Sequence, residues 1–205
     1  MSIYADHVLP RIINVACGAR SMQPLRRRVC EGLSGEVLEI GFGSGLNVAH
    51  YPKSVTAVAA VEPADVGWQL AAKRVASSPV RIERSGLDGQ SLPFHDGCFD
   101  AALSTWTLCT IPDLGAALRE LRRVLKPGGS FHFLEHGLAP DARVQRMQRT
   151  MEPVQKLLFG GCHVTRPIVG LIDRNGFTVT AAESFYLTPG PRWPGAMTIG
   201  VAVAR

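Results

Sequence analysis

Short, almost wholly apolar segments alternate with helical patterns along most of this 205-residue chain. The segments that we expect to be strands lie at residues 36–40, 54–61, 80–84, 99–104 and 130–135. Leucine and alanine at helical spacing fill residues 113–125, between the last two strands. Strands that are apolar on both faces need helices on both sides, so the alternation predicts a parallel sheet of the α/β class.

The last third of the chain adds a long helix and two more strands. Residues 142–159 predict the helix, which Pro153 is expected to kink or break. Its inward face is expected to carry Val144, Met147, Met151, Val154 and Leu158. Residues 177–184 and 197–204 predict strands, and the proline-rich loop between them suits an antiparallel hairpin. No interdomain linker is visible, so we expect a single domain over residues 1–205.

A glycine-rich turn follows the first expected strand, in the stretch LEIGFGSGLN at residues 38–47. Gly41, Gly43 and Gly45 allow a tight turn and the close approach of a ligand. A dinucleotide fingerprint would place its third glycine where Leu46 stands, which disfavours an NAD-dependent dehydrogenase. Glu39, just before the turn, suits a ligand with cationic groups better than a pyrophosphate. A purely structural turn is the alternative, and a helix is expected next, over residues 46–50.

Two acidic residues after later strands complete a candidate nucleoside site. Glu62 ends the second strand, where a carboxylate can accept both hydroxyls of an unphosphorylated ribose. Asp88 lies in the loop after the third strand, where it can accept from an adenine amino group. Taken singly, Glu62 is equally well an ordinary loop acid, and a loop aspartate such as Asp88 is usually only a turn former.

Charge and cysteine usage exclude several classes of protein. The net charge is +5, but the basic residues are spread out, and the cluster of Arg26, Arg27 and Arg28 is interpreted as a solvated helix face. We therefore expect no nucleic-acid partner. Five cysteines without a C-x-x-C pair predict neither a disulfide framework nor a metal site, and favour the reducing cytoplasm. No run reaches the roughly 18 apolar residues of a membrane span, and no secretory signal is visible.

Five motifs occur in order along the chain: E-x-G-x-G-x-G at residues 39–45, Glu62, D-x-x-x-L-P-F at 88–94, F-D-A-A-L at 99–103 and L-K-P-G-G at 125–129. In this combination the chain resembles the class I S-adenosylmethionine-dependent methyltransferases. The resemblance implies a Rossmann-like, doubly wound sheet of seven strands in the order 3-2-1-4-5-7-6, with strand 7 antiparallel. It also implies an enzyme whose cofactor is S-adenosyl-L-methionine.

The resemblance assigns cofactor contacts residue by residue, from the methionine end to the adenine. These residues are Glu39, Gly41, Gly43, Gly45 and Asn47 for the methionine portion, Thr105 beside the sulfur, Glu62 for the ribose, and Asp88 and Gly89 for the adenine.

Further stretches resemble one subgroup of the family: YADHVLP at residues 4–10, SGLNVAHYP at 44–52, TLC at 107–109, FLEH at 133–136 and EPVQKLLFGGCHVTR at 152–166. This subgroup includes mammalian proteins of the endoplasmic reticulum that methylate small alkyl thiols. The resemblance therefore implies a small-molecule acceptor, with a thiol expected first. N-methylation of a phospholipid headgroup or another small amine is the alternative, and a non-enzymatic cofactor-binding module is a third reading. Unlike those proteins, this chain shows no hydrophobic anchor, so we expect at most weak contact with a membrane surface.

His136 is the candidate general base or acceptor-orienting group, because it follows the fifth strand at the edge where ligands of open α/β sheets bind. Glu135 beside it is expected to orient the substrate, and a pair making only local hydrogen bonds is the alternative. Cys162 is interpreted as a small buried hydrophobe. Around this edge we expect lid helices at residues 1–33, a catalytic core at 34–205 and, within it, a cap segment at about 141–168.

Overall fold

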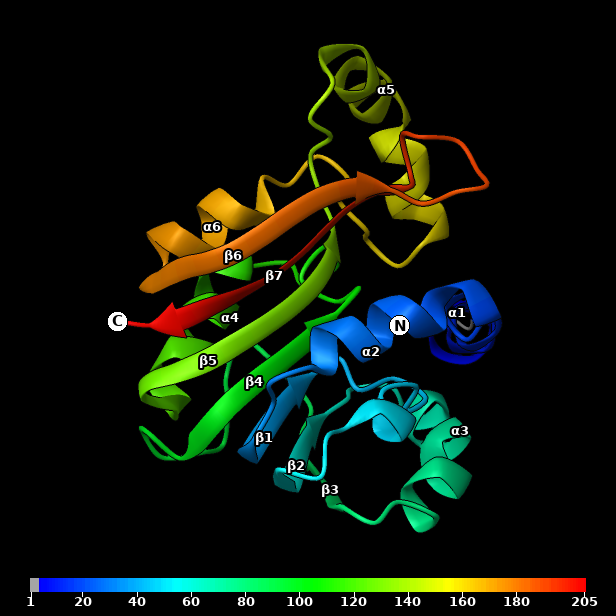
Figure 1. The fold of residues 1–205 in the computed structure, drawn as a ribbon. Coiled ribbons are helices and arrows are strands. Elements are labelled where there is room, and N and C mark those ends of the chain that lie inside the picture. Colours follow the sequence, from blue (N-terminus) through cyan, green and yellow to red (C-terminus); the bar gives the residue numbers. More distant parts are fainter. Residues whose placement is uncertain (1–3) are drawn as a thin grey trace.

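Seven strands form one mixed sheet in the structure, a computed structural model that describes residues 4–205 (Figure 1). In chain order they are β1 (Gly35–Ile40), β2 (Val55–Val61), β3 (Arg81–Gly86), β4 (Phe99–Thr105), β5 (Leu125–His136), β6 (Phe177–Tyr186) and β7 (Ala196–Ala204). Their spatial order is β3-β2-β1-β4-β5-β7-β6. The first five strands pair in parallel, whereas β7 runs antiparallel to both β5 and β6. The predicted fold class, strand order and antiparallel seventh strand are confirmed.

Helices fill the segments between the strands and precede the sheet. The α-helices are α1 (Leu9–Cys17), α2 (Gln23–Cys30), α3 (Asp65–Ala76), α4 (Leu114–Val124), α5 (Ala142–Leu158) and α6 (Ile168–Arg174). The short helical turns are η1 (Tyr4–Val8), η2 (Arg20–Met22) and η3 (Val48–His50). Among the described residues, no helix is both long enough and apolar enough to cross a membrane.

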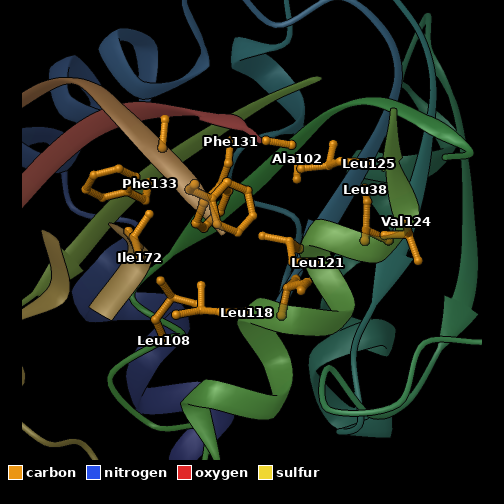
Figure 2. Close-up of a cluster of buried hydrophobic side chains, with 14 of the residues drawn as sticks. Leu38, Ala102, Leu108, Leu118, Leu121, Val124, Leu125, Phe131, Phe133 and Ile172 are labelled. Atoms are coloured by element: carbon orange, nitrogen blue, oxygen red, sulfur yellow. The ribbon is translucent and has the colours of Figure 1, made fainter. Parts of the chain in front are cut away.

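Alternation along β5 divides the core into two layers. Phe131 and Phe133 pack in one cluster with Leu118 of α4 and Ile172 of α6 (Figure 2). Leu134, the next residue of the strand, belongs to a second cluster that includes residues of α2. Because neighbouring side chains of a strand point to opposite faces, α4 and α6 cover one face of the sheet and α2 covers the other. This cover on both sides explains why the central parallel strands β1, β2 and β4 are rich in apolar residues, whereas the edge strand β3 is not.

The boundaries of two predicted elements are corrected by the structure. The helix expected at residues 46–50 is reduced to the 3₁₀ turn η3, because consecutive tight turns occupy the backbone before it, with hydrogen bonds from Gly45 to Phe42 and from Val48 to Gly45. Strand β5 begins at Leu125, directly after α4, and is therefore longer than the expected strand at residues 130–135.

Helix α5 is rotated relative to the prediction. Met147, Val154 and Leu158 were expected to face inward, but their side chains are 51%, 47% and 47% exposed. The expected break is also wrong, since α5 continues through Pro153 as one helix.

A buried glutamine decides which face of α5 is turned inward. The Gln148 amide donates to the carbonyls of Gly137 and Trp193 at 3.0 and 3.1 Å, and it accepts from the Ala139 N–H at 3.0 Å. These bonds satisfy backbone groups in the loops that follow β5 and precede β7, and such groups are costly to leave unpaired when buried. Figure 1 shows α5 beyond the end of β6, beside the loop that leads to β7.

Candidate cofactor site

Two adjoining cavities lie at the carboxyl end of the parallel strands. The first, of about 260 Å³, is lined by the glycine turn after β1, by residues that follow β2 and by the loop after β4. Leu9 and Ile13 of α1 and Phe159 after α5 complete its wall. The second, of about 200 Å³, extends toward Asp88. Both cavities share the lining residues Gly41, Pro63, Thr107 and Thr110, so they form one cleft at the sheet edge where ligands of this architecture bind.

The three glycines of the turn have three different roles. Their φ angles are 75°, 56° and 72°, in the left-handed region that favours glycine. A Cβ added to Gly41 would lie 1.9 Å from Oγ1 of Thr107, and one added to Gly45 would lie 3.2 Å from the Phe42 ring. Gly43 has no neighbour closer than 3.9 Å on that side, so its backbone borders the cavity without a side chain.

Glu62 lies on the wall of the first cavity with its carboxylate held in one orientation. One oxygen accepts a hydrogen bond from the Gly43 N–H at 2.6 Å, and the other accepts from the Ala64 N–H at 2.7 Å. The side chain is buried, and this burial raises its pKa. Each oxygen keeps a lone pair for a further donor, so the carboxylate can accept two ribose hydroxyls, as the sequence predicts.

Glu39 lies behind the cavity rather than on its wall, and only 1% of it is exposed. Asn47 donates to Glu39 at 2.9 Å and to the Thr105 hydroxyl at 3.0 Å, while the Tyr51 hydroxyl donates to the second carboxylate oxygen. Burial raises the pKa of Glu39 to about 7 from its ordinary value of 4.5. In this structure Glu39 and Asn47 brace the turn and Thr105, and Thr105 is the member of the network that lines the cavity.

Arg26 lines the first cavity, although it was not among the site residues predicted from the sequence. It was interpreted as part of a solvated face, but only 4% of it is exposed. Its Nη1 donates to the Asn47 side-chain oxygen at 2.6 Å, and its Nε and Nη2 donate to the Cys17 carbonyl at 3.3 and 3.2 Å. The guanidinium also stacks on Trp106, 4.7 Å from the ring centroid. Because Arg26 lines the first cavity, it places a cation where a ligand carboxylate can be bound.

Glu135 holds the loop that follows β4. Its buried carboxylate accepts from the Ser104 hydroxyl at 2.7 Å and from the N–H groups of Thr107 and Cys109 at 3.1 and 3.4 Å. Burial raises the pKa of Glu135 to about 7. Trp106 in this loop has a φ of 53°, which is uncommon outside glycine. The carboxylate accepts from groups of β4 and of this loop and lines neither cavity, and the expected contact of Glu135 with substrate stays a prediction.

His136 lies beside two cysteines. Its Nδ1 is 3.7 Å from the sulfur of Cys109 and 3.7 Å from that of Cys162, and the two sulfurs are 3.5 Å apart. Contact with Cys109, followed by contact with His136, lowers the pKa of the Cys162 thiol. Among the described residues, His136 does not line either cavity, and its role as a base stays a prediction.

Asp88 and Gly89 lie on the wall of the second cavity, as expected of residues that hold an adenine. The Asp88 carboxylate is exposed and accepts from the Gln90 N–H at 2.8 Å. A Cβ added to Gly89 would lie 3.1 Å from the Ile40 side chain, so the loop packs closely on the end of β1. The structure therefore brings this loop and the glycine turn to the same cleft.

The N-terminal segment and the cap segment contact each other beside the cleft. The Arg166 guanidinium donates to the Ile111 carbonyl at 2.7 Å and so ties the cap segment to the loop after β4. The Tyr4 hydroxyl donates to the Leu158 carbonyl at 2.7 Å and joins the N-terminal segment to the end of α5. These bonds place the expected lid and cap next to each other.

The residues of the cleft fit the S-adenosylmethionine that the resemblance implies. Glu62 offers acceptors for a ribose diol, Arg26 offers donors for an amino-acid carboxylate, and Gly43 leaves backbone accessible to a ligand. A larger surface hollow of about 480 Å³, beside Asn14 and Arg74, contains none of the expected cofactor residues. The smaller pair of cavities is thus the candidate site.

Comparisons with known proteins identify relatives over most of the chain. The family profile described as Methyltransferase domain matches residues 38–133. Thiol S-methyltransferase TMT1A of Homo sapiens is 32% identical over 153 residues, which cover 72% of this chain and 62% of that protein. Thiol S-methyltransferase TMT1B of Mus musculus is 32% identical over 169 residues, which cover 80% of this chain and 68% of that protein. The chain thus spans a little under two thirds of the human relative's length.

A solved structure shares the fold. The S-adenosylmethionine-dependent methyltransferase of Mesorhizobium loti superposes with a TM-score of 0.66, covering 90% of this chain and 98% of that one. The two sequences are 18% identical, so this likeness shows the architecture of the sheet and helices alone.

Proposed function

The chain belongs to the class I S-adenosylmethionine-dependent methyltransferase family, and from this premise we propose that it transfers a methyl group from S-adenosylmethionine to a small-molecule thiol. One observation supports methyl transfer most directly. The Glu62 carboxylate is fixed by the Gly43 and Ala64 N–H groups on the wall of a cavity that Arg26 and Thr105 also line.

In the proposed site, each part of the cleft binds one part of the cofactor. Glu62 accepts from the ribose hydroxyls, and Asp88 with Gly89 borders the adenine. Arg26 binds the carboxylate of the methionine portion. Glu39 and Asn47 act indirectly, because they hold Arg26 and Thr105 in place.

The bound cofactor supplies an electrophilic methyl group on a sulfonium, so the chain needs no covalent nucleophile. Its residues have to align an acceptor and exclude water, and such positioning contributes on the order of 7–11 kcal/mol. Leu9, Ile13 and Phe159 suit this role because they put apolar side chains on the cavity wall. The positive φ of Trp106 and the bonds of Glu135 shape the loop that follows Thr105 and contains Thr107.

A thiol acceptor is supported by the relatives, whose names describe thiol S-methyltransferases, and by its chemistry. A thiol with a pKa of about 8.5 is a few per cent thiolate at neutral pH, so it reacts without a strong base in the site. An amine or hydroxyl would need a positioned base, and no described carboxylate or imidazole other than that of Glu62 lines the first cavity. The base role of His136 is thus needed only for the alternative acceptors.

The experiment is a methyl-transfer assay with S-adenosylmethionine and three acceptor panels, with product masses as the readout. The panels are small alkyl thiols, small amines and phosphatidylethanolamine vesicles. We expect thiol methylation that is lost in Glu62→Ala and kept in Glu83→Ala, whose carboxylate is exposed on β3. If amines or lipid are methylated and the thiols are not, the acceptor is an amine or a lipid and the proposed thiol acceptor is wrong. No turnover on any panel, together with intact binding of S-adenosylhomocysteine, would favour a cofactor-binding module.

We also propose a reducing location such as the cytoplasm for this activity, since all five cysteines are free thiols. The division into a lid at residues 1–33 and a cap at about 141–168 is part of the same proposal, because both segments contribute to the wall of the cleft.

A further inference from the structure

We propose that Cys109, His136 and Cys162 form a binding site for a soft divalent metal ion, with Zn²⁺ as its natural occupant. The three side chains come from the loop after β4, the end of β5 and the loop after α5. Their ligand atoms lie within 4.8 Å of one another. Among the described residues, no further histidine, cysteine or carboxylate belongs to this cluster. The inference does not depend on the proposed methyl transfer.

The spacing of the three ligand atoms matches one face of a tetrahedral zinc site. Zinc binds sulfur at about 2.3 Å and histidine nitrogen at about 2.0–2.1 Å, so tetrahedral angles place two sulfurs about 3.8 Å apart and a sulfur and a nitrogen about 3.6 Å apart. The corresponding distances here are 3.5 Å between the sulfurs and 3.7 Å from His136 Nδ1 to each of them. A metal ion therefore needs only small shifts of these side chains.

The backbone around the cysteines is already held in place. Glu135 accepts from the Cys109 N–H at 3.4 Å, and the Cys109 carbonyl accepts from the His163 N–H at 2.8 Å. The Cys162 N–H donates to the Phe159 carbonyl at 3.2 Å. Preorganised ligands lose little conformational freedom when the metal binds, and outer partners such as Glu135 hold the ligand-bearing segments in place.

The surroundings suit two thiolates and a dication. Cys109 and Cys162 are 1% and 3% exposed and pack with the apolar side chains of Val164 and Trp193, so the site is largely screened from water. Two thiolates and one neutral imidazole neutralise the ion's charge, and the thiol protons are released to solvent on binding. Soft thiolate ligands favour zinc over magnesium or calcium. Three protein ligands leave a fourth position for water or an added ligand.

The test is metal binding by the full chain after reduction and treatment with a chelator, with Zn²⁺ or Co²⁺ alone as the probe. We expect one equivalent of Zn²⁺ per chain, and a thiolate-to-metal charge-transfer band with Co²⁺. Both should disappear in Cys109→Ser and Cys162→Ser. Cys98→Ser is the matched control and should keep them, since Cys98 lies outside the cluster and bonds to the His95 carbonyl.

A second variant and a second readout separate metal binding from folding. His136→Gln alters a partly exposed residue and should weaken Zn²⁺ binding while the circular dichroism spectrum is unchanged. Zn²⁺ should also protect Cys109 and Cys162 from alkylation, as measured by peptide mass spectrometry. Less than a tenth of an equivalent bound by the folded, reduced chain would overturn the proposal. Binding that survives both serine variants, or a Cys109–Cys162 disulfide that forms while the reduced chain takes up no metal, would do the same.

Discussion

The Arg26 guanidinium donates to the side-chain oxygen of Asn47 at 2.6 Å, so helix α2 is tied to the end of the glycine turn inside the protein. The same Asn47 donates to Glu39, the next-to-last residue of β1, and to Thr105, the last residue of β4. Three segments that are distant in the sequence thus share one buried polar network behind the candidate cofactor site. A buried polar network fixes the relative positions of these segments as long as every polar group in it keeps its hydrogen-bond partner.

Removing the cation from this network should destabilise the fold. Arg26→Ala leaves the buried Asn47 oxygen and the part-buried Cys17 carbonyl without their donor, and one unpaired buried acceptor costs about 1–3 kcal/mol. We expect this loss in the free energy of unfolding, measured by urea denaturation, with weaker binding of S-adenosylhomocysteine. Arg27→Ala is the control because Arg27 is exposed on the same helix. Equal stability of the two variants would contradict the role given to Arg26.

Removing the Glu62 carboxylate should weaken cofactor binding. Hydrogen bonds to a charged group contribute about 1.5–3 kcal/mol each, so loss of two ribose contacts lowers affinity by about 100-fold or more. Calorimetric titration of Glu62→Ala with S-adenosylhomocysteine measures this effect. Glu83→Ala should bind like the parent chain. Unchanged affinity in Glu62→Ala would contradict the proposal that Glu62 binds the ribose.

The buried carboxyl of Glu39 should make stability depend on pH. Its pKa is about 7 in the folded chain against an ordinary value of 4.5, so between these values the folded state holds a proton that the unfolded state has released. The free energy of unfolding therefore falls as pH rises from about 4.5 to 7, by at most about 1.4 kcal/mol per pH unit from this group. Urea denaturation across this range should show a flatter dependence for Glu39→Gln.

The control for this effect is Glu36→Gln, which alters an exposed carboxyl on the same strand. It should leave the slope of stability against pH unchanged. A slope in Glu39→Gln equal to that of the parent chain would show that Glu39 does not retain its proton on folding.

Loss of the Tyr4 hydroxyl should loosen the segment that covers the cleft. Its bond to the Leu158 carbonyl joins the N-terminal segment to α5, and a net contribution of about 0.5–1 kcal/mol corresponds to a two- to fivefold change in local opening. Amide hydrogen exchange in α1 should accelerate by that factor in Tyr4→Phe. Tyr186→Phe is the matched control, since it removes a hydroxyl bonded to Asp141, away from α1. Equal exchange in both variants would contradict the contact.

Local sequence patterns were sufficient to predict the layers of the fold and several of the residues that line the cleft. Apolar strands alternating with helical patterns gave the correct layers, and the positions of Gly41, Glu62 and Asp88 after successive strands predicted one cleft because parallel strands end at a common edge. A signal for Arg26 was also present. It precedes the buried Val29 and Cys30 by three and four residues, so it shares their face of α2. The cluster of arginines obscured that spacing.

The exposed face of α5 could not be predicted in the same way. Its apolar residues have helical spacing, but the side that turns inward is chosen by Gln148, whose amide meets three backbone groups in distant loops. The backbone groups of those loops that need a partner cannot be identified from the sequence of the helix alone, although leaving them unpaired when buried would be costly.

By itself, the sequence determined the alternation of strands and helices, the glycine turn and the acidic residues of the cleft, because each depends on neighbours along the chain or on the shared edge of a parallel sheet. The strand order followed from the resemblance to the family. Only the tertiary structure decided the rest. It buried Arg26 behind the turn, directed Glu135 to a loop, and brought Cys109, His136 and Cys162 together from three segments. Contacts of this kind depend on how distant segments pack on one another, so the periodicity of the local sequence does not predict them.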